Sequence, residues 1–446
     1  MFLKLLKDAV KVRLVRNKIL FTIFILFVFR VGTHITVPGI NAKSLEALSN
    51  VPFLNMLSLV SGNAMRNFSV FALGVSPYIT ASIIVQLLQM DILPKFVEWG
   101  KQGEVGRRKL NQATRYISLG LAFVQSIGIT AGFNALSGVQ LTNMPLNWQM
   151  YLLIGSILTT GSVIVTWLGE QITEKGYGNG TSMIIFAGII SSLPGTFHEI
   201  YIDRFVNIES SRLGESAIFV AILVVLILLV VYFTTFVQQA EYKLPIQYTK
   251  RAQGAPSSSY LPLKLNPAGV IPVIFAGSIT AVPTSLIQYF ASQNQSAGWL
   301  LTVQEYFDYS TVKGMLVYAG LIIVFTFFYT FVQVNPEKTA ESLQKSAAYI
   351  HGVRPGNGTE QYLSKLLTRL ATVGALFLSF VALLPIIAQN LFGLSSNIAF
   401  LGTSLIIVIS TSIEGIKQLE GYLLKVAFQL LDSFNTCRDN NDQTCT

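Results

Sequence analysis

The chain is divided by ten apolar segments, most of them long enough to cross a membrane as a helix. They fall at residues 19–37, 69–90, 116–136, 150–169, 181–194, 217–237, 268–288, 315–334, 371–389 and 398–413. An α-helix rises about 1.5 Å per residue, so roughly 20 residues cross roughly 30 Å of hydrocarbon. Hydrophobic residues make up 52% of the chain and charged residues only 12%, against about 25% charged in soluble domains. The sequence therefore predicts an all-α, polytopic membrane protein with ten transmembrane helices.

Lys and Arg residues are distributed unequally between the two sides of this predicted bundle. The two termini and the loops after the second, fourth, sixth and eighth segments hold 25 of the 31 basic residues. The opposite loops hold five, and Arg30 lies within the first segment. Because positively charged loops stay in the cytoplasm, both termini are predicted to be cytoplasmic. Residues 1–18 are basic and amphipathic and have no signal-peptide cleavage pattern, so we expect them to be retained.

Five segments fall in residues 19–200 and five in residues 201–424, so corresponding segments of the two halves run in opposite senses, as in an inverted repeat. The second half carries two long polar insertions, residues 238–267 and 335–369. They are either solvated loops that follow the positive-inside rule or docking surfaces for an acidic or phosphate-bearing cytosolic partner, because loops of such length often bind. Arg30 either faces a cavity or a partner or extends to the outer interface.

One further apolar stretch, residues 53–67, is too short to cross the membrane and is interrupted by Ser61, Gly62 and Asn63. Such a stretch is typical of a re-entrant or interfacial segment. It is either a surface helix outside the cytoplasm or a movable plug that folds back into a funnel. The residues assigned to this candidate plug are Phe53, Leu54, Leu57, Leu59, Val60, Ser61, Gly62 and Asn63.

The sequence offers little for catalysis or cofactor binding. The three histidines, His34, His198 and His351, are scattered, and no HExxH or GxSxG motif occurs. The two cysteines, Cys437 and Cys445, lie near the end of the chain, away from any histidine at metal-ligand spacing. We therefore expect neither an enzyme nor a metal or cofactor. A secondary transporter for a small solute and a purely structural membrane scaffold remain as alternatives to a conduit.

Six strings along the chain resemble signatures of the SecY family, which forms the pore of the bacterial Sec protein translocase. They are FALGVSPYI at 71–79, GEVGRRK at 103–109, WLGEQIT at 167–173, LPLKLNPAGVIP at 261–272, HGVRPG at 351–356 and GTSL at 402–405. Their order and spacing are similar to those of the family over residues 10–424. The tail after Leu424, residues 425–446, departs from the basic ending common in that family.

The resemblance implies two pseudo-symmetric five-helix halves that form a clamshell around an hourglass pore, with residues 53–67 as the plug. A lateral gate would open towards lipid between the second and third spans on one side and the seventh and eighth on the other. It implies that the pore ring consists of Val75, Ile79, Thr181, Ile185, Ile274 and Ile407. Aliphatic side chains fit around a passing polypeptide without trapping it and resist wetting when empty. Thr181 departs from this rule, and its hydroxyl either bonds the carbonyl four residues earlier or leaves the seal wetter.

The resemblance also implies polar gate residues and docking sites. Gln86, Gln125 and Asn266 lie on or beside the gate helices, and we expect their amides to bond one another, because unpaired amides are costly in lipid. Lys250, Arg251 and Arg354 are implied to dock the SecA ATPase or the ribosome. SecE, SecG, signal peptides, nascent polypeptides and membrane lipids are the other implied partners, and the bacterial cell membrane is the implied location.

Overall fold

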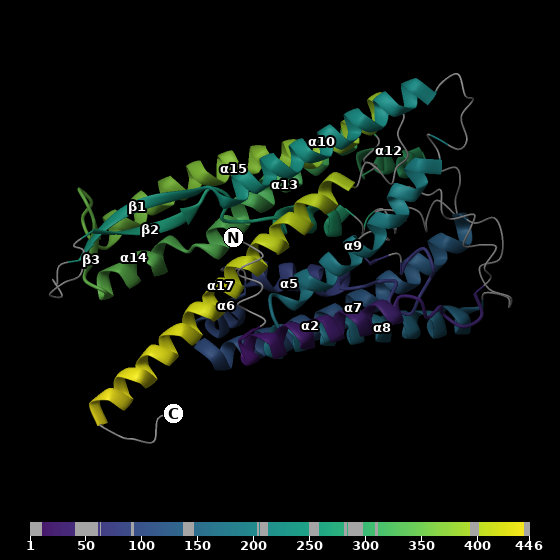
Figure 1. Ribbon diagram of the computed structural model, residues 1–446. Coiled ribbons are helices and arrows are strands. Elements are labelled where there is room, and N and C mark those ends of the chain that lie inside the picture. The colour runs from purple at the N-terminus through teal and green to yellow at the C-terminus, as the bar shows by residue number, and fades with distance from the viewer. Residues whose placement is uncertain are drawn as a thin grey trace.

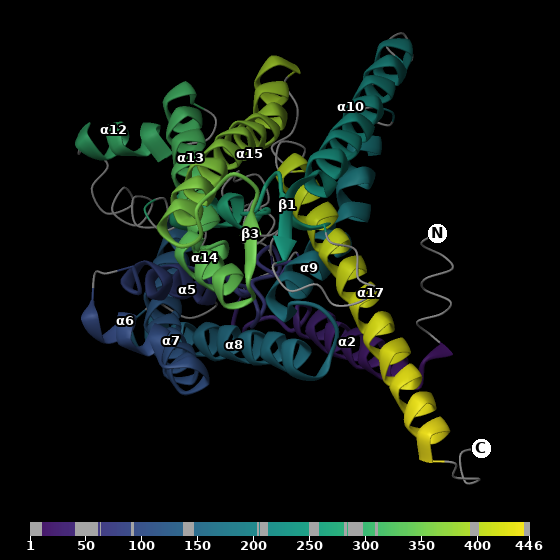
Figure 2. The same ribbon diagram turned by 90° about the vertical axis from the view of Figure 1, so that its left-hand side faces the viewer.

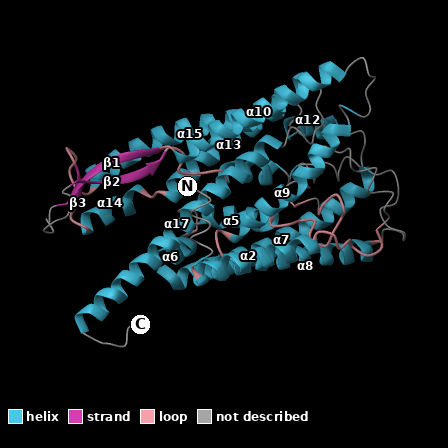
Figure 3. Cartoon of the chain, in the orientation of Figure 1, coloured by secondary structure: helices cyan, strands magenta, loops and turns pink. Residues whose placement is uncertain are grey.

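The computed structural model describes residues 11–40, 61–62, 64–90, 93–136, 147–202, 205, 213–248, 258–280, 283, 298–307, 311–392 and 401–440. Long helices make up most of the described chain, and a single small sheet lies at one end (Figure 3). The secondary structure thus agrees with the predicted helical membrane bundle, with the sheet as an addition.

The first group of helices comes from the N-terminal half of the chain and forms the lower bundle in Figure 1. It contains α2 (Arg13–Gly32), α5 (Ser76–Leu88), α6 (Pro94–Lys101), α7 (Gly103–Leu136), α8 (Trp148–Lys175) and α9 (Gly180–Tyr201). Helix α7 packs against both α5 and α8, and α2 packs against α8 and α9. These contacts place α8 in the middle of the group.

The second group comes from the C-terminal half and, apart from α17, lies above the first in Figure 1. It contains α10 (Leu213–Gln239), the apolar helix Ile271–Thr280, α12 (Gly298–Phe307), α13 (Val312–Gln333), α15 (Asn357–Phe392) and α17 (Leu401–Asn440). Helix α17 packs against α10 and α15 of its own group and also against α2 and α9 of the first. Figure 2 shows α17 running diagonally past both groups. The division into two halves related by inverted symmetry stays a prediction.

The two long polar insertions fold together instead of remaining open loops. Strands β1 (Glu241–Tyr248), β2 (Ser258–Lys264) and β3 (Ala348–Ile350) form an antiparallel sheet in the order β2-β1-β3. The short helix α14 (Pro336–Lys345) lies beside it (Figure 1). Apolar residues alternate along the strands, and one face packs into a separate small core with α15, built from Leu244, Ile246, Leu263, Ile350, Leu363 and Leu370. The sequence analysis did not predict these strands, although apolar residues alternate with polar ones in EYKLPIQY and LPLKL, a pattern that indicates strands.

Each of the ten predicted spans overlaps a helix in the described chain, but several limits differ. The second span was predicted to be continuous over residues 69–90, and this is wrong for its first part, because α5 begins only at Ser76. Gly74 has a φ of +54°, outside the helical region, and Pro77 favours the first turn of a new helix. Within the described residues, five helices are long and apolar enough to cross a membrane, and Ser76–Leu88 and Ile271–Thr280 are shorter apolar helices.

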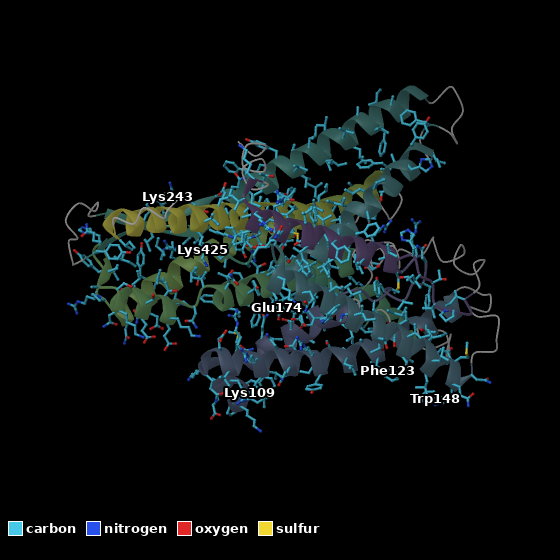
Figure 4. All side chains as sticks on the ribbon, turned by 60° about the horizontal axis from the view of Figure 1, so that its bottom comes forward. Lys109, Phe123, Trp148, Glu174, Lys243 and Lys425 are labelled. Atoms are coloured by element: carbon cyan, nitrogen blue, oxygen red, sulfur yellow. The ribbon has the colours of Figure 1, made fainter. Side chains whose placement is uncertain are left out.

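The outer surface of the bundle is apolar where a lipid-embedded protein must be. Helix α10 is hydrophobic on all sides, and only 11% of its most apolar window is buried. Its exposed side chains include Ile222, Val225, Leu228 and Phe236. A helix of this composition is stable against hydrocarbon but not against water. In Figure 4, Lys109, Lys243 and Lys425 lie towards the sheet end of the molecule, whereas Trp148 lies at the far end.

Candidate functional site: an apolar cluster shared by the two helix groups

Five of the six predicted pore-ring residues lie in one apolar cluster. Val75, Ile79, Ile185 and Ile407 are buried members of the largest hydrophobic cluster, and Ile274 is partly buried against it. They come from both helix groups: Val75 and Ile79 from the start of α5, Ile185 from α9, Ile274 from the helix Ile271–Thr280 and Ile407 from α17. The fold therefore brings together branched aliphatic side chains that are far apart in the sequence. Their role as a pore ring remains a prediction.

The sixth predicted pore-ring residue is Thr181. It is the second residue of α9, and both its backbone N–H and its hydroxyl donate to the Asn179 carboxamide oxygen, at 3.2 and 2.8 Å. The predicted alternative, a bond from the hydroxyl to the carbonyl four residues earlier, is wrong, because α9 begins at Gly180 and offers no helical carbonyl there. Asn179 instead satisfies donors of the first helical turn. Thr181 is thus a helix-start residue one turn before Ile185.

The chain before α5 is fixed to two neighbouring helices. Thr36 and Ser69 form an antiparallel bridge, with Val37 N donating to Phe68 O at 3.1 Å and Val70 N to Ile35 O at 2.9 Å. The Ser162 hydroxyl of α8 donates to Gly74 O at 2.9 Å. These contacts hold residues 68–74 against the end of α2 and against α8. The position of Val75 in the apolar cluster depends on them.

The same part of α8 approaches the backbone of this segment very closely. A Cβ atom added to Gly161 would lie 1.8 Å from Val70 O. On the other side of the segment, the Phe71 ring stacks on Phe29 of α2, with ring centroids 6.1 Å apart, and covers Gly32. Glycines on two helices thus make room for residues 70–71, an arrangement typical of tightly packed membrane helices.

Most of the candidate plug lies outside the described residues: Phe53, Leu54, Leu57, Leu59, Val60 and Asn63. Ser61 and Gly62 are described and are buried. The Arg30 guanidinium donates from Nη1 to Gly62 O at 2.8 Å. Of the two sequence-based interpretations of Arg30, the structure therefore favours a charge directed at a partner within the protein.

The predicted mutual pairing of the gate amides is wrong. Gln86 donates from Nε2 to Ser82 Oγ of its own helix at 3.2 Å, and Asn266 donates from Nδ2 to Gly269 O at 2.7 Å. The amide oxygens of Gln86 and Asn266 are buried without a hydrogen-bond partner in the described chain. Both side chains satisfy their donors locally, which costs less conformational entropy than reaching across a gate. Asn266 packs against Gly374 of α15, and Gln125 is buried on α7.

The candidate docking residues belong to the sheet end of the molecule. Arg354 is exposed in the turn between β3 and α15, and its carbonyl accepts a hydrogen bond from the Thr359 hydroxyl at 3.1 Å. Lys250 and Arg251 lie outside the described residues, in the connection between β1 and β2. Lys243, another basic residue of this insertion, has its ammonium 5.0 Å from the Tyr260 ring centroid across the β1–β2 pair. The strand alternation noted above would have placed these two side chains on one face.

Comparison with known proteins decides the family. A family model described as SecY matches residues 69–416. The chain is 73% identical over 425 residues to the protein translocase subunit SecY of Streptococcus gordonii, which covers 95% of this chain and 97% of that protein. The corresponding protein of Bacillus subtilis is 46% identical over 95% of this chain and 97% of its own length. This chain belongs to the SecY family. Membership sets aside the alternative of a small-solute transporter.

Solved structures show the same fold at low sequence identity. A protein-conducting channel matches with a TM-score of 0.64 and 17% identity over 91% of each chain. Sec61 in the canine ribosome-channel complex from the endoplasmic reticulum matches with a TM-score of 0.61 and 17% identity, also over 91% of each chain. The arrangement of helices in this SecY chain is therefore that of known channel proteins, including one observed on a ribosome.

Proposed function

We propose that this SecY chain is the central channel of a Sec translocon. It passes unfolded secretory polypeptides across the membrane and releases transmembrane segments sideways into lipid. The observation that carries the proposal is the convergence of Val75, Ile79, Ile185, Ile274 and Ile407 from both helix groups in one apolar cluster. When the channel is empty, a ring of such side chains closes by burying its own apolar surface. The ring also closes around an extended polypeptide, and it does not trap the polypeptide because aliphatic side chains form no hydrogen bonds with it.

The surrounding helices supply the other parts of the mechanism. Helices α5 and α7 form one side of the proposed lateral gate, and the helix Ile271–Thr280 and α13 form the other. The unpartnered amide oxygens of Gln86 and Asn266 are buried beside it. Residues 53–67 are the proposed plug, which blocks the empty channel. The channel opens when the two helix groups move apart. Helix α17 contacts helices of both groups.

Energy for transport comes from partners on the cytoplasmic side. We place both termini and the sheet end there, because 25 of the 31 basic residues belong to that side. The exposed Arg354 and the Lys250–Arg251 connection dock the SecA ATPase or the ribosome. SecE and SecG associate with the bundle in the bacterial cell membrane, and signal peptides enter at the gate.

A crosslinking experiment tests the conduit directly. A secretory polypeptide is stalled during export, and a photoreactive residue replaces Ile79 or Ile274 at the constriction. The matched control replaces Ile222, which is 54% exposed on the outward face of α10. We expect the stalled chain to label the two constriction positions and not the control. Labelling at Ile222 with none at Ile79 or Ile274 would show that polypeptides do not pass through this cluster.

A further inference from the structure

Helix α17 carries an acidic side chain on the face that joins the apolar cluster. Glu414 follows Ile407 by seven residues in α17, and seven residues make almost two full turns of an α-helix, about 10 Å along its axis. The two side chains therefore lie on one face of the helix. The C-terminal end of α17 lies on the same side of the molecule as the sheet (Figure 1). Glu414 thus lies between Ile407 and the sheet side.

A contact with the helix Ile271–Thr280 places Glu414 at the same level relative to a second pore-ring candidate. A Cβ atom added to Gly269 would have Glu414 Oε1 as its nearest neighbour, at 3.9 Å. Gly269 directly precedes this helix and comes five residues before Ile274. It also follows β2, the strand that ends at Lys264. The Glu414 carboxylate therefore lies on the sheet side of Ile274 as well.

The other flank of this part of α17 packs on the turn that leads into α9. A Cβ atom added to Gly415 would lie 2.7 Å from the Tyr177 hydroxyl oxygen. Tyr177 lies just before α9 begins, and Ile185, the pore-ring candidate of α9, follows in that helix. Three elements that carry pore-ring candidates therefore meet on the sheet side of the apolar cluster, and Glu414 lies where they meet.

The Glu414 carboxylate has no close partner of its own. It is half-buried, and no residue of the described chain forms a hydrogen bond or an ion pair with it. The charge of Lys264 acts on it, but the Lys264 side chain is exposed at the end of β2 and is not in contact with it. A carboxylate that is partly withdrawn from water is costly unless a cation pairs with it. Within the described residues, Glu414 therefore keeps its capacity to bind a cation.

We propose that Glu414 binds the Lys and Arg side chains of a polypeptide as they approach the apolar cluster. The inference rests on the proposed function, in which the polypeptide passes through that cluster. A basic side chain loses hydration when it enters an aliphatic ring, which offers it no hydrogen bonds. A carboxylate in front of the ring pairs with this side chain and keeps the basic segment from slipping back to the cytoplasm. A partly exposed ion pair shifts an equilibrium by roughly twofold to tenfold, so the side chain is also released again.

The test compares two versions of one secretory protein. They differ only in a run of four residues in the mature part, which are lysines in one version and glutamines in the other. The full chain is purified with its bound subunits and placed in vesicles, and the initial rate of transport is measured for both versions. We expect Glu414→Gln to lower the rate of the lysine version, relative to the glutamine version, roughly twofold to tenfold. Glu414→Asp retains the charge, and we expect a smaller loss.

Glu420→Gln is the matched control. It removes the same charge from the same helix, but Glu420 lies about 120° around the helix axis from Glu414. Its neighbour Leu419 packs with Val15 of α2. We expect this variant to keep the wild-type ratio of the two rates. An unchanged ratio in folded Glu414→Gln overturns the proposal. Equal slowing of both versions by Glu414→Gln means that the residue is only structural, and this result overturns it too.

A crosslinking measurement keeps the test decisive if Glu414→Gln does not fold. The lysine version is stalled in the wild-type channel and treated with a carbodiimide, which joins a carboxylate to an amine that touches it. We expect mass spectrometry to find Glu414, and not Glu420, joined to one of the four lysines. Absence of this crosslink overturns the proposal. If the wild-type preparation transports neither version, the channel proposal fails instead.

Discussion

The close approach of α8 to the backbone before α5 gives a prediction with a definite sign. In Gly161→Ala, the new Cβ of α8 lies 1.8 Å from Val70 O and 2.7 Å from Val70 C. Real carbon atoms are almost never found within 3.0 Å of such neighbours. The obstacle is backbone, so no side-chain rotation relieves it. Helix α8 and residues 69–75 must therefore separate by about 1 Å or more in a closely packed region.

The separation has two energetic consequences. Overpacking a well-packed interior typically costs about 1–3 kcal/mol. Moving α8 away also lengthens the 2.9 Å bond from Ser162 to Gly74 O, and a buried hydrogen bond left unmade costs about 1–3 kcal/mol. We therefore expect Gly161→Ala to lower the free energy of unfolding by about 2–6 kcal/mol. Because Val75 follows the displaced segment directly, we also expect protein transport in vesicles to fall.

A glycine on the neighbouring helix provides the control. Gly120 of α7 has no atom within 4 Å of the position that a Cβ would take. Gly120→Ala should therefore stabilise the helix by about 0.5–1 kcal/mol, through the lower backbone entropy of alanine in the unfolded chain. The assay is the thermal midpoint of both variants in detergent, followed by size-exclusion chromatography. A midpoint for Gly161→Ala equal to or above that of the wild type would refute the packing argument.

Two further predictions concern the cytoplasmic end. Arg354→Glu should leave membrane insertion and the thermal midpoint almost unchanged, because the side chain is exposed, but should cripple SecA-driven transport in vesicles; undiminished transport contradicts the docking role. Lys417→Gln removes the 2.7 Å ion pair between α17 and Glu241. The hydrogen bond from Lys417, aided by nearby lysines, lowers the pKa of Glu241 below its ordinary 4.5, so the pair stabilises the fold above that pH and loses this contribution as the pH falls through the lowered pKa. The pair is partly exposed and contributes at most about 1 kcal/mol. The wild-type advantage in thermal midpoint should therefore be present at neutral pH and vanish well below pH 4.5; an advantage that persists in acid rules out this pair as its source.

Much of the fold could be predicted from the sequence, because hydrocarbon imposes a simple physical rule. Backbone polar groups inside a membrane must bond within their own segment, so apolar runs of sufficient length have to be helices. Each predicted span accordingly overlaps a helix. The predicted first and last residues of the spans were less reliable. Residues 69–75 are as apolar as a helix requires, yet they form a bridge and turns, because Ser69 pairs with Thr36 and Gly74 has a positive φ.

The polar contacts could not be predicted, because they depend on which helices meet. Gln86, Gln125 and Asn266 are suited to bond one another, but the structure gives Gln86 and Asn266 local partners instead. A bond from the Thr181 hydroxyl to the carbonyl four residues earlier was one of two alternatives, and the start of α9 at Gly180 directs the hydroxyl to Asn179 instead. In each case, the hydrogen-bond partner depends on where a helix ends or on which backbone lies nearby. Amino-acid composition does not predict either of these.

The sequence by itself determined the membrane setting, the helical character, the charge asymmetry and, through its motifs, the family. Only the tertiary structure brought Val75, Ile185 and Ile407 into one cluster and directed the Arg30 guanidinium at the Gly62 carbonyl. The physical reason is the range of the forces involved. Transfer of a segment into hydrocarbon depends on that segment alone, whereas a shared apolar cluster and a hydrogen bond between Arg30 and Gly62 require precise contacts between segments that are distant along the chain.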